Sequence, residues 1–466
     1  LSCTRFLRQE TELASIPAFG VEYWKLRIQR HALWRKNGHE WLGPLTPFIG
    51  ESGPYKPATT RGLLALTTHS SFLEHSKLIA LAECEAWAWV EELRIGISPR
   101  ALSRLLDSPL LSRLASLNLS RRALGTEGAE QLTQSTFLSN LSRLNLFGCG
   151  IAPSGLDALL SSEKISRLQS LNLASNTLTD DGVRSLCESR LQLRDLNLDW
   201  TSLTSESWRL LSRAPWLSSL ESLSLASSTA DSSSQAELFH SPNLSDLKHL
   251  RLSQCALGRE GIRALTGAAF VNSLKSLDLS FTGMNAGSLW RLASVCWNRL
   301  NHLDLSHNEL NRPLIDALDD APNLTGQLTA LTLTGHQLSS EAVARLSHCS
   351  FLSGIRSLRF STTHLRLGSI TQLLQSPQLQ NLEELILDNL DYRHRERIGG
   401  MISGSGLQSL RRLKIMEGGI SDTTASQLVR SKTLENLQEL WVSDYWPLSQ
   451  KAQEMLLERF VDVHWL

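Results

Sequence analysis

A leucine that returns about every 27 residues constrains the fold of this chain more than any other feature. Around Leu171 the chain reads Leu-Gln-Ser-Leu-Asn-Leu-Ala-Ser-Asn-Thr-Leu over residues 168–178. Leu171 and Leu173 alternate with Asn172 and Ala174, which is the period of a strand with one buried and one exposed face. The central leucine of this pattern recurs at Leu93, Leu117, Leu144, Leu171, Leu196, Leu223, Leu250, Leu277, Leu303, Leu331, Leu358, Leu385, Leu413 and Leu440.

The second half of each unit has the spacing of a helix. Leu178 and Leu186 lie two helical turns apart, with Gly182 between them, where a small residue lets a neighbouring backbone approach. Other units place Gly155, Ser207, Ala342 and Thr424 at this small position. Residues that cap helix starts precede two of the helices, at Thr179-Asp180 and Ser421-Asp422.

A strand, a bend at Asn176 and a helix in units of about 27 residues resemble leucine-rich repeats of the ribonuclease-inhibitor-like class. The resemblance implies an α/β solenoid shaped as a horseshoe, with a parallel β-sheet on the concave side and helices on the convex side. About fifteen turns are expected over residues 90–466, of which the last is shortened and has its strand near residues 460–465. Cys149 and Cys255 stand where Asn176 stands in its own repeat, and we expect both to be unpaired packing residues.

Residues 1–89 differ from the repeats, and we expect a mainly helical N-terminal cap. Five of the thirteen tryptophans fall here, and residues 23–36 have the pattern of an amphipathic helix. Residues 61–66 could form a short strand. A cap would cover the apolar flank of the first repeat. The alternative is an independent recognition or catalytic module.

Three runs in this segment carry a second resemblance. They are Leu26-Arg27-Ile28-Gln29, His39-Glu40-Trp41-Leu42-Gly43-Pro44-Leu45 and Arg61-Gly62-Leu63. Residues 23–95 resemble the N-terminal companion region of bacterial, planctomycete-type leucine-rich-repeat proteins. The chain lacks the leading acidic segment of that family, and the resemblance implies no catalytic residue. The chain begins at Leu1 without Met, so residues upstream could be missing.

Two repeats break the pattern. Residues 227–234 lack the leucine and glycine that follow the bend elsewhere, which predicts a helix that starts late or a loop. Residues 391–397 stand where another bend is expected, and most of them are charged. A basic patch for an acidic partner, or only a solvated surface, could form there together with Arg359, Arg366, Arg411, Arg412 and Lys414.

Side chains that alternate with the strand leucines should line the concave wall, and we expect a protein partner to bind there. Four successive asparagines would stack into a ladder about 4.8 Å apart, either as a polar groove for a partner or because the repeat tolerates asparagine. Asp278 and Asp304, with Asp195 and Asp199 upstream, could form an acidic strip. The predicted binding residues are Asn118, Asn145, Asn172, Asn197, Asp199, Arg251, Asp278, Asp304, Arg359 and Trp441.

Aromatic residues directly after strands, Phe147, Trp200 and Phe281, could also expose their rings as contacts for a partner, or pack along the rim. Signatures of catalysis and of phosphate or dinucleotide binding are absent from the sequence. His302, Asp304 and His307 form the nearest approach to a metal cluster, which is too small for a zinc site. We therefore predict no catalytic residue, metal or cofactor.

Charge and hydropathy narrow the classes of partner and of cellular location that the chain can have. Lys and Arg together number 46, as do Asp and Glu, so there is no overall attraction to nucleic acid or to an anionic membrane. No apolar run is long enough to span a bilayer. We predict a non-enzymatic, monomeric, cytoplasmic scaffold for protein–protein interaction. The alternatives are the substrate-recognition part of an enzyme whose catalytic segment is N-terminal or missing, and a structural or envelope-associated repeat protein.

Overall fold

The structure is a computed structural model of the 466-residue chain. It describes residues 19, 22–27, 29, 32–33, 36, 45, 58–60, 63–68, 83–84, 87, 90–95, 97–308, 312–335, 338–361, 365–389, 394–443 and 446–465. The chain divides into two compact units, Leu1–Leu247 and Lys248–Leu466.

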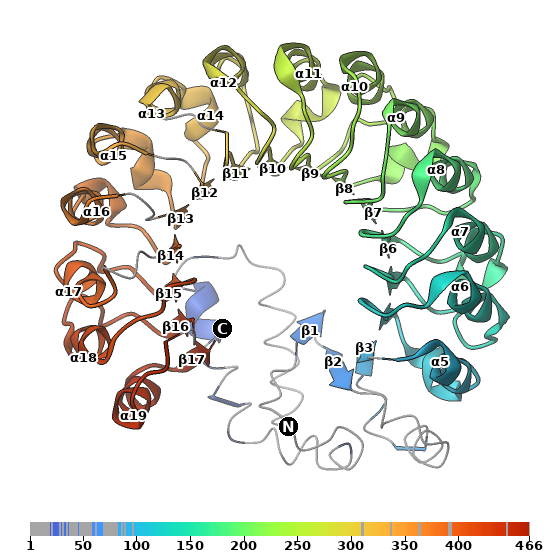
Figure 1. Ribbon diagram of the computed structural model, residues 1–466, viewed down its shortest axis with the longest axis horizontal. Coiled ribbons are helices and arrows are strands. Elements are labelled where there is room, and N and C mark those ends of the chain that lie inside the picture. The colour runs from blue at the N-terminus through green and yellow to red at the C-terminus, as the bar shows by residue number, and fades with distance from the viewer. Residues whose placement is uncertain are drawn as a thin grey trace. The chain divides into compact units, whose positions relative to one another are not determined.

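The first unit is a sheet of short strands, parallel except for β1, with helices along one side of it (Figure 1). Its strands are β1 (Ala58–Thr60), β2 (Leu63–Thr68), β3 (Val90–Ile95), β4 (Ser116–Asn118), β5 (Arg143–Asn145), β6 (Ser170–Asn172), β7 (Asp195–Asn197) and β8 (Ser222–Ser224). The helices after β3 are α5 (Pro99–Leu106), α6 (Gly125–Gln134), α7 (Pro153–Leu160), α8 (Thr179–Glu188), α9 (Ser205–Ser212) and α10 (Ser232–Phe239). Short 3-10 helices follow three of them, at η4 (Pro109–Arg113), η5 (Glu163–Ile165) and η6 (Pro215–Ser219).

The second unit repeats this arrangement, with all its paired strands parallel. Its strands are β9 (His249–Arg251), β10 (Ser276–Asp278), β11 (His302–Asp304), β12 (Ala330–Leu333), β13 (Ser357–Ser361), β14 (Glu384–Asp388), β15 (Arg412–Ile415), β16 (Glu439–Val442) and β17 (Asp462–Trp465). Its helices are α11 (Gly258–Thr266), α12 (Ala286–Ala293), α13 (Arg312–Asp319), α14 (Pro322–Thr325), α15 (Ser340–Leu346), α16 (Leu367–Leu374), α17 (Ile398–Ser403), α18 (Asp422–Arg430) and α19 (Gln450–Arg459). Its 3-10 helices are η7 (Ala269–Asn272), η8 (Ser350–Gly354) and η9 (Pro377–Leu379).

The recurring leucines set the register of both sheets, as predicted. In the first unit Leu93, Leu117, Leu144, Leu171, Leu196 and Leu223 are successive partners. In the second unit the series runs from Leu250 through Leu440 and ends at Val463 of the last, short strand. All of these leucines are buried. Six strands from β3 to β8 and nine from β9 to β17 agree with the predicted fifteen turns.

Buried asparagines at the bend connect neighbouring repeats. Asn176 is one of them. Its side-chain oxygen accepts hydrogen bonds from the backbone N–H groups of Cys149 (3.1 Å) and Ile151 (2.8 Å) in the preceding repeat. Its amide donates to the carbonyls of Leu146 and Leu173. Asn308 makes the equivalent four bonds in the second unit. Each asparagine thereby satisfies backbone groups that the bend would otherwise leave buried and unpaired.

The cysteines at the same position are packing residues. Cys149 and Cys255 are buried and form no disulfide. Burial raises the pKa of the Cys149 thiol to about 11, so it stays protonated at neutral pH. Its Sγ lies 3.2 Å from the carbonyl of Leu119, in place of the asparagine bond.

The small helix positions allow close packing, but one predicted cap acts elsewhere. A Cβ at Gly155 would lie 3.0 Å from the Cα of Thr126 in the neighbouring helix. Ser421 caps α18 as expected, accepting from the N–H of Thr424. Thr179 does not cap α8, because it has a left-handed φ of 56° and the N-cap residue is Leu178. Asp180 instead accepts hydrogen bonds from the start of the next helix, α9.

The prediction of a late or looped helix at residues 227–234 is wrong. Helix α10 begins at Ser232, ten residues after the start of its strand, as α9 does. Although the usual leucine and glycine are missing, Asp231 determines where the helix starts. It caps the helix by accepting a hydrogen bond from the N–H of Ser234 at 2.8 Å. Its own N–H donates to Ser205 Oγ at 2.9 Å. A local cap and one bond to the neighbouring repeat are sufficient to start the helix.

The described part of residues 1–89 adds strands as well as helix. All described residues between 22 and 36 are helical, as predicted. Strand β2 overlaps the expected strand at 61–66 and pairs in parallel with β3, while β1 pairs with β2 in antiparallel orientation. Trp87 is buried and its indole N–H donates to the carbonyl of Leu110, 3.2 Å away, in the first repeat. Among described residues, no helix has the length and apolarity to cross a membrane.

Removing one leucine of the register should show how far each repeat depends on it. We expect Leu171→Ala to lower the free energy of unfolding by about 2 to 5 kcal/mol, because the side chain is fully buried and leaves a cavity. The exposed-face control Ser170→Ala should stay within about 0.5 kcal/mol of the wild type. Urea unfolding followed by circular dichroism measures both, and equal losses would contradict the role of the leucine.

The cap of α10 should give a measurable acid sensitivity. The N–H of Ser234, with side-chain hydrogen bonds from Ser234 and Ser205, lowers the pKa of Asp231 to about 2. Since folding lowers this pKa, ionised Asp231 contributes stability that is complete above about pH 4 and is lost as the pH falls toward 2. Asp231→Asn keeps the cap acceptor but cannot ionise. We expect urea midpoints of wild type and variant to converge between about pH 4 and 2; a constant difference would contradict this.

Candidate functional site

The exposed strand face consists of the residues on either side of each central leucine, which point away from the core. In the first unit the register makes Asn118, Asn145, Asn172 and Asn197 direct neighbours on successive strands. All four are partly exposed. The predicted asparagine ladder is therefore present as a row of adjacent side chains.

Each asparagine of this ladder has a structural hydrogen bond of its own. The side-chain oxygen accepts from the backbone N–H two residues later, over distances of 2.9 to 3.0 Å. This bond fixes the side chain and uses the oxygen. The amide NH₂ groups are what remains for recognition, so the ladder can offer donors to a carbonyl-rich or acidic partner surface.

Asp199, predicted to belong to the exposed wall, is only 1% exposed, and that prediction is corrected. Its carboxylate accepts from Ser224 Oγ at 2.5 Å and from the N–H of Ala226 at 2.7 Å, both in the next repeat. The backbone turns inward one residue after Leu198, so the strand alternation that placed Asp199 outside has ended there. Asp199 holds repeats together.

In the second unit Arg251, Asp278 and Asp304 are neighbours on three successive strands. Arg251 Nε lies 3.0 Å from Asp278 Oδ2, which neutralises one carboxylate of the expected acidic strip. Both aspartates make the same bond as the asparagines, accepting from N–H groups two residues later at 2.9 Å. Burial, with repulsion from Asp278, raises the pKa of Asp304. The strip is therefore a mixed-charge surface.

The surface near the C-terminal end, where a basic patch was one of two alternatives, is of mixed charge at Arg359 and Arg412. Arg359 pairs with Asp388 at 2.5 Å. Arg412 lies between Glu384 (2.9 Å) and Glu439 (2.7 Å), as shown by its two ion pairs. Burial opposes ionisation of Glu384, but Arg412 and its hydrogen bond lower the pKa of that carboxyl. These bonds argue against the basic-patch alternative at Arg359 and Arg412, because partners from adjacent strands, 27 to 29 residues away, neutralise both arginines.

Aromatic rings lie on or directly after the strands in each of the two units. Trp441 stacks on His464, with ring centroids 3.6 Å apart, and Lys414 Nζ lies 5.2 Å from its ring. Trp200 and Phe281 are 41% and 48% exposed, as expected for residues directly after strands. Phe281 stacks on His307, and Phe147 lies beside the guanidinium of Arg121. Exposed rings of this kind are common anchors of protein interfaces.

No group of three or more histidine, cysteine or acidic side chains able to hold a metal ion is found among described residues. His302 and Asp304 do share the exposed face of β11, as predicted. Burial, with the nearby His249, lowers the pKa of His302.

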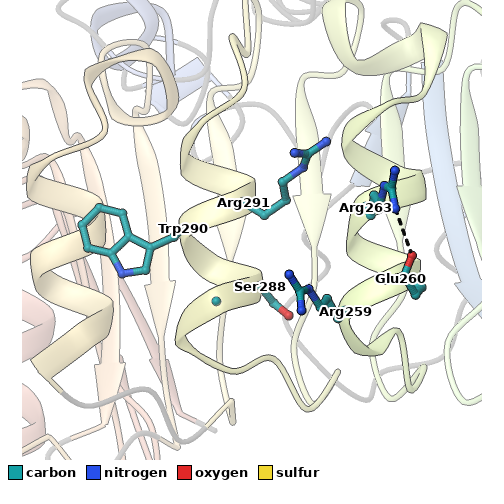
Figure 2. A pocket seen from close by; sticks show the side chains of 7 residues that line it. Arg259, Glu260, Arg263, Ser288, Trp290 and Arg291 are labelled. Atoms are coloured by element: carbon teal, nitrogen blue, oxygen red, sulfur yellow. Dashed lines mark ion pairs between the residues drawn. The ribbon is translucent and has the colours of Figure 1, made fainter.

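The helix side holds a groove that the sequence reasoning missed. It lies between α11 and α12 and is lined by three arginines and a buried serine (Figure 2). A comparison of equivalent helix positions could have found it, because Arg259 stands where Asp180 stands in α8.

Three segments of the chain, residues 137–160, 166–187 and 243–265, match the family model described as a Leucine Rich repeat. The chain contains leucine-rich repeats. Together with the parallel strands in leucine register and the alternating helices, this makes the fold a leucine-rich-repeat solenoid.

Two complexes are among the solved structures that the chain matches, both at low similarity. The chain is 16% identical to a chain of the TLR13–ssRNA13 complex, with a TM-score of 0.39. The match covers 77% of the present chain and 56% of the chain in that complex. It is also 16% identical to a chain of the Rad7 and Elc1 complex in yeast, with a TM-score of 0.46. That match covers 94% of the present chain and 96% of the chain in the complex. No curated protein matches the sequence. Since these identities and TM-scores are low, the assignment of the fold rests on the repeats of the chain itself.

The asparagine ladder allows its structural and recognition roles to be separated. Asn172→Ala should cost about 1 kcal/mol of stability, because the N–H of Ala174 loses its acceptor. Asn172→Asp should cost less, because Asp278 makes the same bond at the equivalent position. Urea unfolding measures both changes. An Asp variant as unstable as the Ala variant would show that the amide group itself is structural.

Proposed function

We propose that this leucine-rich-repeat protein is a non-enzymatic scaffold that binds a protein partner on the exposed strand face. The observation that carries the proposal is the hydrogen bonding of that face. Its asparagines and aspartates are held by backbone N–H groups before any partner arrives. A preformed surface loses little conformational entropy on binding.

The proposed binding residues follow the predicted set without Asp199. They combine amide donors, mixed charge and one aromatic anchor, a composition that suits a protein surface. They are Asn118, Asn145, Asn172, Asn197, Arg251, Asp278, Asp304, Arg359 and Trp441. Oligomeric state and location stay predictions: a monomer in the cytoplasm.

Residues 1–89 are proposed to cap the repeats at residues 90–466. The hydrogen bond from Trp87 to Leu110 and the pairing of β2 with β3 support this role, since both cover the first repeat. The resemblance of residues 23–95 to planctomycete-type companion regions, and that of the repeats to the ribonuclease-inhibitor-like class, stay predictions.

Partner capture with matched variants tests the proposal. The full chain, immobilised, is exposed to a lysate of the source cells, and retained proteins are identified by mass spectrometry. Asn145→Arg with Asn172→Arg changes the strand face, whereas Gln134→Arg with Ser166→Arg adds the same charge at exposed positions off the strands. We expect the first pair to abolish capture of one protein that the wild type and second pair retain. Circular dichroism confirms that both variants are folded.

The other outcomes point elsewhere. Loss of the partner in the control pair alone would place the interface on the helices and contradict the proposal. Capture of nothing by the wild type would favour the structural, envelope-associated alternative. Turnover of a retained partner would favour the enzyme alternative, in which the repeats select the substrate.

A further inference from the structure

The groove between α11 and α12 is a second candidate site, on the helices and separate from the strand face. It has a volume of about 510 Å³ and is lined by Arg259, Glu260, Arg263, Gly287, Ser288, Trp290 and Arg291. Figure 2 shows the side chains of Arg259 and Arg291 in the space between the two helices. Arg263 lies beside Glu260 on α11, and the indole of Trp290 is on the other side of α12.

Positive charge is in excess in this groove. Arg263 has an ion pair with Glu260 on the same helix, at 3.7 Å. Arg291 is held by a hydrogen bond from its Nε to Thr266 Oγ1, at 3.3 Å, and no carboxylate among the described residues forms an ion pair with it. Arg259 adds a further exposed guanidinium. Three arginines against one glutamate favour an anionic ligand.

Ser288 indicates where that ligand binds. The residue is only 2% exposed, and its hydroxyl has no hydrogen-bond partner among described residues. Its N–H is already bonded to the side chain of Asn285 at 2.9 Å. A buried hydroxyl without a partner costs free energy, so a donor facing a cationic groove is suited to an anionic oxygen.

Another repeat shows which group satisfies the equivalent hydroxyl. Ser207 is the third residue of α9, as Ser288 is of α12, and its hydroxyl donates to the carboxylate of Asp180 from the preceding helix. The same carboxylate accepts from Thr204 Oγ1 at 2.8 Å. Asp180 is the second residue of α8, and the second residue of α11 is Arg259. The carboxylate of Asp180 connects α8 to α9, whereas an arginine, Arg259, stands at the equivalent position between α11 and α12.

We propose that an acidic peptide segment of a protein partner binds in this groove. One of its carboxylates would accept from the Ser288 hydroxyl and from Arg259, in the place that Asp180 occupies between α8 and α9. A second carboxylate would pair with Arg291. The groove extends along two helices and offers separated guanidiniums, which suits several carboxylates in an extended chain better than one compact anion.

Binding of a fluorescein-labelled, end-blocked hexaglutamate peptide to the full chain, measured by fluorescence anisotropy at low ionic strength, tests this proposal. Arg259→Gln with Arg291→Gln should weaken binding by about tenfold or more, since two charge-assisted contacts are lost. Arg366→Gln with Arg430→Gln removes the same charge from exposed positions outside the groove and should leave binding unchanged. Hexaglutamine should not bind.

Ser288→Ala tests the hydroxyl separately. It should weaken binding by about tenfold without lowering the urea midpoint, because no hydrogen bond to the described part of the protein is lost. Unchanged affinity would overturn the assignment of Ser288, and equal losses in both arginine pairs would overturn the site in favour of non-specific attraction. Stronger displacement of the peptide by inorganic phosphate than by glutarate would overturn the carboxylate ligand. None of these outcomes depends on the strand face.

Discussion

The in-register burial of one leucine per repeat is the constraint on which the rest of this structure depends. A single strand of three residues and its helix cannot bury their own apolar side chains, so each repeat is stable only against its neighbours. Leu171 is covered because Leu144 and Leu196 are its partners in the sheet. Once this register is set, every polar residue at a fixed offset from the leucine falls beside its equivalents, and rows of like side chains result.

The polar rows have two roles, and the structure separates them. Asn176 and Asn308 are buried and bond mainly to the backbone, with both the oxygen and the amide bonded; Asn308 also accepts from Thr282 Oγ1. Asn172 uses its oxygen for the backbone and keeps its amide at the surface. Asp278 makes the same bond while its second oxygen pairs with Arg251. The repeat therefore fixes the geometry at this position and leaves open whether donors or charges are displayed, which is how a constant framework carries a variable surface.

The helix side follows a similar rule. Contacts between successive helix starts use a carboxylate in some repeats: Asp180 bonds to α9, and Asp422 accepts from the N–H of Ser449 at 3.0 Å. Where Arg259 takes that place, the partner hydroxyl of Ser288 is left without a bond within the described part of the chain. A position that departs from the pattern of the other repeats, and whose lost bond no other residue replaces, is where a functional site is to be expected.

The sequence by itself determined the class of fold and its register, because both depend on periods within one repeat. The leucine spacing, the bend at Asn176, the small residue at Gly155 and the cap at Ser421 could all be identified from adjacent residues. The tertiary structure decided what depends on the next repeat. Asp199 is buried, Asp180 caps a neighbouring helix and Arg412 is neutralised by Glu384 and Glu439, through contacts 24 to 28 residues apart in sequence. A period reveals which side of a strand a residue occupies, but hydrogen bonds and charges are paired across repeats, and only the packed structure brings those partners together.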